Sequence, residues 1–167
     1  MARYPLLSVL LAAAITIFTV GCSGPAPKLS VLDAQVTEQT DAGMVVTFTM
    51  MADNPSGEAL PLRDVEYEVS LHGKPVFKGT RSAQATVRRF GTQDFTLPCA
   101  IPLSPDQPAP SGTVPYTIQG TITYLVPGAL AEALFDMDVL RPTTSFEGRG
   151  VVDLSAKSQP APRAATQ

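Results

Sequence analysis

The chain has 167 residues, of which 44% are hydrophobic and 16% are charged, and its formal net charge at pH 7 is -3. The apolar content excludes an intrinsically disordered chain, and the acidic balance argues against a nucleic-acid-binding protein, which needs a basic surface. The chain has no Trp and one His, which narrows the catalytic chemistry, while its 16 Pro and 12 Gly favour many turns over a helical bundle.

The first segment, residues 1–21, combines Arg3 with an uncharged apolar run from Pro5 to Val20. A positive start, an apolar stretch and a small residue at its end are typical of a secretory signal peptide. A helix formed by this run would span roughly 24 Å, less than the ~30 Å core of a bilayer. A removable signal is therefore favoured, with a plain signal peptide or an uncleaved anchor as the alternatives.

The apolar run ends in Thr19-Val20-Gly21-Cys22, which resembles the bacterial lipobox. The resemblance implies that Cys22 is acylated and becomes the new N-terminus, and more than one acyl chain gives a stable membrane anchor. Residues 22–27 would then be the lipidated Cys and a short tether. Ser23, where Asp would signal retention, resembles an outer-membrane address facing the periplasm in a Gram-negative cell.

Between residues 28 and 155 apolar and polar residues alternate, a pattern typical of half-buried antiparallel strands. About seven strands at this spacing, with 44–51 central, predict one all-β domain, an antiparallel β-sandwich. The remaining residues, 156–167, are predicted to form a disordered tail, and the proline-rich stretch 104–115 a long loop. The strand pattern is carried by residues 29–39, 44–51, 65–71, 76–78, 83–89, 95–103, 116–124 and 146–154. The pattern is weak in two of these runs, 76–78 and 83–89.

One stretch, Gly128–Met137, departs from the strand period. Leu130, Leu134 and Met137 recur at helical spacing among good helix formers. We expect a short helix packed on one end of the sandwich. A loop with a hydrophobic plug is the alternative.

Cys99 and His72 are the two remaining residues with reactive side chains, and both are interpreted as structural. If Cys22 carries lipid, Cys99 has no partner for an intramolecular disulfide, and its place in an alternating run indicates a small buried hydrophobe. A reactive thiol would need a cationic neighbour, and none is near in sequence. His72 precedes Gly73 in an apparent hairpin turn. We therefore predict a non-enzymatic protein with no catalytic residue, metal site, cofactor or small-molecule substrate.

Three groupings of residues are candidate binding sites. Asp136, Asp138 and Glu147 could meet a calcium ion but are expected to be solvated surface charges. Arg88-Arg89-Phe90 has the composition of a nucleic-acid contact, yet is expected to be a strand edge with an ion-pair partner. Gly148-Arg149-Gly150 lies inside a strand pattern, which indicates a bulge or a close backbone approach instead of a phosphate loop.

The stretch NPSGEALPLRDVEYEVSLHGKPVFKG, residues 54–79, resembles the late-embryogenesis-abundant type 2 (LEA type 2) proteins and their water-stress-and-hypersensitive-response (WHy) domain. The pattern is an Asn-Pro turn, a Leu-Pro-Leu segment, an alternating strand, a Gly hairpin and a return strand that ends in Gly. The matching positions, all expected to be structural, are Asn54, Pro55, Leu60, Pro61, Leu62, Val65, Tyr67, Val69, Gly73 and Gly79.

The resemblance implies an immunoglobulin-like or fibronectin-III-like sandwich with a helix at one side, and a protective role in desiccation and other stress. The leading hypothesis is a lipid-anchored envelope protein that shields proteins or membrane during water loss. The alternative is an adaptor module that binds one envelope partner through its edge strands or the 104–115 loop.

Overall fold

A computed structural model describes residues 26–103 and 111–155 of the chain. The lipobox, the tail from residue 156 and most of the proline-rich loop lie outside these residues. Within them the chain forms eight strands and one helix. The elements are β1 (Lys28–Thr40), β2 (Gly43–Asn54), β3 (Leu60–Leu71), β4 (Lys74–Ser82), β5 (Thr86–Val87), β6 (Gly91–Pro102), β7 (Thr113–Tyr124), α2 (Ala129–Asp136) and β8 (Thr143–Asp153).

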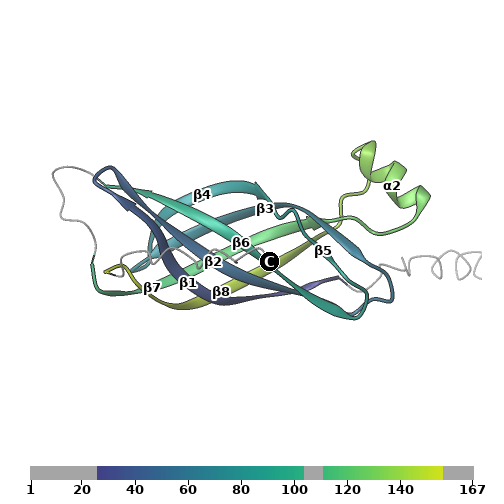
Figure 1. Cartoon of the computed structure of the whole chain (residues 1–167). Helices are drawn as coiled ribbons and strands as arrows, with labels where there is room; N and C mark the ends of the chain where they lie inside the picture. Colours follow the sequence, from purple (N-terminus) through teal and green to yellow (C-terminus); the bar gives the residue numbers. More distant parts are fainter. Residues whose placement is uncertain (1–25, 104–110, 156–167) are drawn as a thin grey trace, which may run out of the picture.

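The strands form two antiparallel sheets, which confirms the predicted β-sandwich (Figure 1). One sheet has the order β1-β2-β6, with β2 in the central position that the sequence predicts. The other has the order β4-β3-β7-β8, and the two-residue strand β5 pairs with the start of β3. Because most strands are long, the sandwich is elongated (Figure 1).

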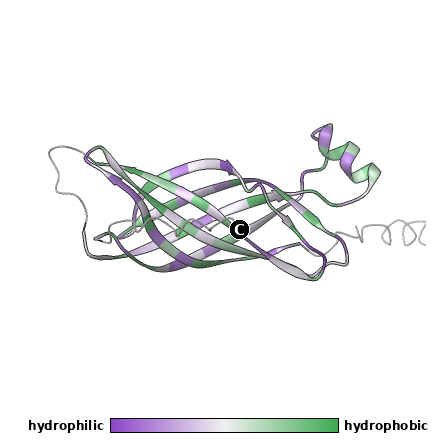
Figure 2. Ribbon diagram, in the orientation of Figure 1, coloured by the Kyte–Doolittle hydropathy of each residue, from purple (hydrophilic) through white to green (hydrophobic). Residues whose placement is uncertain are grey.

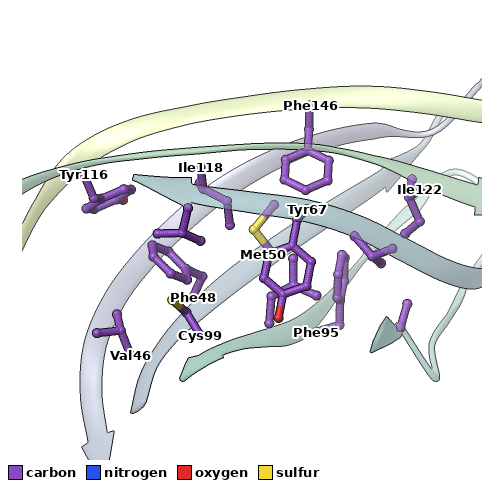
Figure 3. Packing of buried hydrophobic residues seen from close by; sticks show 14 of the residues in the cluster. Val46, Phe48, Met50, Tyr67, Phe95, Cys99, Tyr116, Ile118, Ile122 and Phe146 are labelled. Atoms are coloured by element: carbon purple, nitrogen blue, oxygen red, sulfur yellow. The ribbon is translucent and has the colours of Figure 1, made fainter. Parts of the chain in front are cut away.

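The core lies between the two sheets and follows directly from the alternating sequence. Every second residue of β2 is buried, and the intervening residues are partly exposed. The strands of the sandwich carry both apolar and polar colours along their length (Figure 2). The Phe48 ring meets the Tyr116 ring edge-on, with 5.1 Å between centroids. The Tyr67 hydroxyl donates a hydrogen bond to the carbonyl oxygen of Pro98 and so joins β3 to β6 across the core (Figure 3).

The edge strand β1 closes one side of the sandwich against β8. Its register on β2 shifts twice, between Val31 and Asp33 and between Val36 and Glu38, so its buried positions do not follow a single period. Gly148 allows β8 to approach it, since an added Cβ would lie 2.2 Å from a Val31 methyl carbon. The glycine of this strand therefore marks the close backbone approach that the sequence suggested.

The two ends of the sandwich differ in their connections. The hairpin end carries the two-residue turns at 41–42 and 72–73, which join long strands directly, and the longer connection 103–112 between β6 and β7. The β1 end is where β1 begins, and it also carries the connections 55–59, 88–90 and 125–142, the last of which contains α2. Figure 1 shows α2 projecting from this end.

Two expectations about local structure need correction. The predicted helix exists, but α2 buries none of its residues, and Leu130 is 74% exposed. The helix is joined to the sandwich by flanking segments that hydrogen-bond to β3 and β7, which hold it outward instead of over the core. The predicted strand at 83–89 shrinks to Thr86–Val87, which pair with Pro61 and Leu60 of β3. Ala83 and Ala85 add one backbone hydrogen bond each to Arg63 and Leu62 of the same strand.

Candidate functional site

The Asn54 side chain fastens the connections of the β1 end to each other. It is fully buried, and its amide nitrogen donates hydrogen bonds to the carbonyl oxygens of Glu58, Val87 and Arg88, at 2.7, 3.3 and 3.1 Å. Its amide oxygen accepts hydrogen bonds from the backbone N–H and the hydroxyl of Ser56, at 2.9 and 2.7 Å. One side chain thus ties the β2–β3 connection to the β5–β6 turn.

The turn held by Asn54 presents Arg88, Arg89 and Phe90 to solvent. The backbone N–H of Phe90 donates to the carbonyl of Ser56 at 3.0 Å, and the ring approaches Gly57. Phe90 is 74% exposed and has a positive φ of 48°. The expected strand edge with an ion-pair partner is wrong, because these arginines lie in a turn and form no ion pair with the described residues.

The other motif residues lie in β3 and β4 and shape the core. The Leu-Pro-Leu segment begins β3, and the register of β3 on β7 shifts between Leu62 and Val65, so that both residues face inward despite an odd separation. Pro61 accepts a hydrogen bond from the N–H of Leu125 at 2.9 Å, and Pro55 follows the last residue of β2. The buried motif side chains of β3 are Leu60, Leu62, Val65, Tyr67 and Val69.

Two motif glycines serve different needs. Gly73 follows His72 in a two-residue hairpin, and both have positive φ, 73° and 50°, as a type I′ turn requires. Gly79 pairs with Tyr67 across the sheet, and a Cβ at Gly79 would lie 2.9 Å from the ring of Phe77. The motif therefore specifies one hairpin turn and one close ring contact.

The outer face of the four-stranded sheet carries a groove of about 670 Å³. It crosses β4, β3, β7 and β8. The cross-strand register places two rows of outward-facing polar residues beside each other, with a row containing Gly79 and Gly120 between them. The outward residues that line the groove are Glu66, Glu68, Lys78, Thr80, Gln119, Thr121, Ser145 and Glu147.

The groove is acidic and hydrogen-bonding in character. Three carboxylates, from Glu66, Glu68 and Glu147, face one ammonium group, that of Lys78, while Glu147 also pairs with Arg149 at 2.5 Å. Within residues 26–103 and 111–155, no cluster of His, Cys, Asp and Glu has an arrangement able to hold a metal ion. The surface can therefore offer hydrogen bonds and negative charge to a partner, with one cation to orient it.

The thiol of Cys99 is sealed in the core. Cys99 is fully buried opposite Val46, and burial raises the pKa of its thiol to about 12. Burial, and then the neighbouring Cys99, likewise raise the pKa of the Tyr67 hydroxyl to about 12. At neutral pH both groups are protonated, and a thiol in that state is a poor nucleophile. This placement confirms the small buried hydrophobe that the alternating sequence indicates.

Two of the acidic residues considered as calcium ligands, Asp138 and Glu147, belong to separate ion pairs. Asp138 follows α2 and pairs with Arg141 at 2.5 Å, whereas Glu147 lies in the groove and pairs with Arg149. These are exposed ion pairs, which contribute at most about 1 kcal/mol to stability. The lipidation residue, Cys22, lies outside the described residues, and none of the described helices is long and apolar enough to cross a membrane.

Sequence reasoning missed the groove and the role of Asn54. The signal for the groove is the set of polar residues at alternate positions of four runs. Each run looks like an ordinary solvated face, and only the register shows that the faces adjoin. The sequence predicts a turn at Asn54-Pro55, but two of the hydrogen-bond partners of Asn54 lie 33 and 34 residues further on, a separation that sequence spacing does not reveal.

Comparison with solved structures finds the same fold in plant proteins. The solution structure of AT1g01470 from Arabidopsis thaliana matches with a TM-score of 0.58 and 16% identity, covering 78% of this chain and 83% of that one. The solution structure of At2g46140.1, described as a late embryogenesis abundant (LEA) protein, matches with a TM-score of 0.58 and 17% identity, covering 89% and 83%. No curated protein matches the sequence.

The family model of the late embryogenesis abundant proteins (LEA type 2) matches residues 49–136, more than half of the chain. The matched range runs from within β2 through α2, so it contains the Asn54 interactions, the β3 motif and three of the four strands of the grooved sheet. It also contains the exposed helix. The chain therefore belongs to the late embryogenesis abundant protein family, in its type 2 form.

Proposed function

We propose that this late embryogenesis abundant protein is a non-enzymatic protectant of the cell envelope, anchored by lipid on Cys22. The observation that carries the proposal is the family match over residues 49–136. The lipobox resemblance at residues 19–22 supports the anchor. With Ser23 after the Cys, the anchored domain belongs on the outer membrane, facing the periplasm of a Gram-negative cell.

The placement of the reactive side chains supports a role without catalysis. Cys99 lies in the core with its pKa raised to about 12, and His72 lies in an exposed turn of the hairpin end. A protectant uses surface groups instead, and the groove supplies carboxylate, hydroxyl and amide groups. Such groups can replace the hydrogen bonds that water makes to a client protein as water is removed. His72→Ala and Cys99→Ala variants are expected to protect as well as the parent chain.

The protective role is tested by drying. Residues 23–155 are mixed with a dehydration-sensitive enzyme, dried and rehydrated, and the recovered activity is compared with that after drying with an equal mass of inert protein. We expect higher recovery with the LEA domain. Equal recovery would contradict a protective function.

The anchor is tested separately by metabolic labelling. The parent chain should incorporate labelled fatty acid and fractionate with membranes, and a Cys22→Ala variant should do neither. A Cys22→Ala variant that stays in the membrane fraction would show that residues 1–21 are a permanent transmembrane helix.

The groove favours a second function, an adaptor for one envelope partner. Its position over four strands, with one lysine among three carboxylates, is the kind of surface that gives a partner a defined orientation. A photoreactive residue at Gln119, in the groove, is compared in intact cells with one at Gln93, on β6 of the other sheet. One stoichiometric adduct at 119 alone would favour the adaptor, and no discrete adduct would favour the general protectant.

A further inference from the structure

Exposed apolar side chains are concentrated at the β1 end of the sandwich. Of seven large apolar side chains exposed among the described residues, five lie in its connections: Phe90, Leu130, Met137, Val139 and Leu140. The other two, Leu32 and Val151, lie on edge strands. Figure 2 shows apolar colour on the projecting helix. Scattered exposed residues are ordinary, but a group at one end of a protein marks an interaction surface.

Helix α2 is amphipathic although it buries nothing in the sandwich. At 3.6 residues per turn, Leu130 and Met137 lie on one face, and Glu132 and Asp136 lie on the opposite face. The side toward the sandwich carries Phe135, whose ring lies 5.9 Å from the Arg63 guanidinium and 5.1 Å from that of Arg141.

A helix held in this way keeps its apolar face free. Arg63 of β3 contacts the helix through the Phe135 ring, whereas Leu130 and Met137 are 74% and 62% exposed. Val139 and Leu140 follow the helix in sequence and are also exposed, at 69% and 45%.

The exposed turn 88–90 lies at the same end of the sandwich as α2. The turn 88–90 follows β5, which pairs with the start of β3, and the segment leading to α2 hydrogen-bonds to that same part of β3. The turn offers two exposed guanidinium groups, from Arg88 and Arg89, and the exposed ring of Phe90. Cationic and aromatic side chains together suit the polar–apolar boundary of a membrane, where anionic headgroups lie above acyl chains.

The start of β1 lies at the same end of the sandwich as this turn. Lys28 pairs with Asp53, and Asp53 pairs with Thr92 at the beginning of β6, so the point where the chain enters the domain lies two strands from the turn 88–90. From Cys22 to Lys28 a fully extended chain reaches about 20 Å. A strand of 12 residues, such as β2, is about 40 Å long. A lipid on Cys22 therefore holds the β1 end, and not the hairpin end, next to the bilayer.

We propose that the β1 end is a second membrane contact, in which the apolar face of α2 and the Arg88–Phe90 turn lie in the interface of the lipid bilayer. The proposal rests on the lipid anchor at Cys22. The occupant is lipid, because the short tether places this end at the membrane, where a bilayer is present at all times. The acidic face of α2 then points away from the headgroups.

The test compares two positions with nearly equal exposure. Met137 is 62% exposed at the β1 end, and Val151 is 64% exposed on β8, near the hairpin end, where it pairs with Pro115. Met137→Cys and Val151→Cys variants of the full, lipidated chain are labelled with an environment-sensitive fluorophore and reconstituted into phosphatidylethanolamine–phosphatidylglycerol vesicles. Cys99 is buried and stays unlabelled, and the unsubstituted chain serves as the blank.

Brominated acyl chains should quench the label at 137 by about half or more and leave the label at 151 unchanged, because an interfacial helix lies roughly 5–10 Å into the bilayer. Adding Leu130→Ser should weaken the quenching at 137. Equal quenching at both positions, or none at 137 while the chain floats with the vesicles, would overturn the second contact and leave the anchor intact.

Failure of the chain to float with vesicles would instead overturn the anchor itself. Two further outcomes would show that the β1 end binds something other than lipid. Protection of the 137 label in cells but not in protein-free vesicles would indicate a protein partner. Protection that depends on protein concentration without vesicles would indicate a second copy of the chain.

Discussion

The two ends of the sandwich connect their strands in different ways. At the hairpin end, the turn at His72 and Gly73 joins β3 to β4 with two residues of positive φ and little else. At the β1 end, the connections 55–59 and 88–90 depend on the buried side chain of Asn54, and Phe90 and the face of α2 are exposed. Among the described residues, large exposed apolar side chains occur in the connections of the β1 end and not in those of the hairpin end.

The apolar side chains of the chain therefore have two roles. Side chains such as Phe48, with no exposed area, stabilise the fold, whereas Leu130, at 74% exposure, contributes little to it. Substitutions at the two kinds of position should therefore separate stability from surface function, and the expected effects can be ranked.

The largest effect is expected in the core. Phe48→Ala removes a fully buried ring that packs on Tyr116, and should lower the free energy of unfolding by about 3–5 kcal/mol in urea titrations. Phe48→Leu, which keeps most of the volume, should cost about 1.5 kcal/mol or less. Similar midpoints for all three proteins would show that the core is not packed as described.

The next effect is expected at the β1 end. Asn54→Ala leaves the carbonyl groups of Val87 and Arg88 without their donor and should cost about 2–3 kcal/mol, with faster amide exchange in residues 88–90. The matched control is Gln93→Ala, whose amide donates only to the exposed neighbouring carbonyl of Asp94. A change in exchange for Gln93→Ala as large as for Asn54→Ala would remove the special role of Asn54.

A smaller effect is expected from alkaline pH. Because burial raises the pKa of Cys99 from 9.0 to about 12, the unfolded chain loses the thiol proton first as pH rises. Stability should be complete below pH 9 and should fall by roughly 1 kcal/mol between pH 9 and 10, then further toward pH 12. Tyr67, raised from 10.0 to about 12, adds to the loss above pH 10.

The Cys99→Ala variant isolates the thiol contribution. Its stability starts lower, because a buried side chain is lost, but its midpoint in urea should be nearly constant from pH 9 to 10. A decline as steep as that of the parent chain in this window would assign the pH dependence to another group.

The smallest effect is expected on the face of α2. Leu130→Ser combined with Met137→Ser should change the free energy of unfolding by about 0.5 kcal/mol or less, because both side chains are already exposed. A loss of several kcal/mol would show that α2 packs on the sandwich after all.

The sequence predicts the strands well because their side chains alternate over long runs. β2 and β7 show this period without interruption, and both lie where the pattern places them. β1 is harder, since two register shifts break its period. The run 83–89 has strand-forming composition, but only Thr86 and Val87 pair in register with β3, and Ala83 and Ala85 make isolated backbone hydrogen bonds to it.

The surfaces are less predictable, because they depend on which residues adjoin across strands. The groove combines Lys78, Glu68, Gln119 and Glu147 from four strands, and only their register makes them a row. Leu130 and Met137 have the spacing of a packed helix, and the sequence alone does not distinguish a face that meets the core from a face that meets a partner.

The central claim, an envelope protectant held at the membrane by Cys22, is tested most directly by drying whole cells. Survival after desiccation is compared between cells that produce the parent chain, cells that produce equal amounts of the Cys22→Ala variant, and cells without the chain. The account predicts the highest survival with the parent chain and survival near the chain-free level with Cys22→Ala. Equal survival of all three cultures would contradict it.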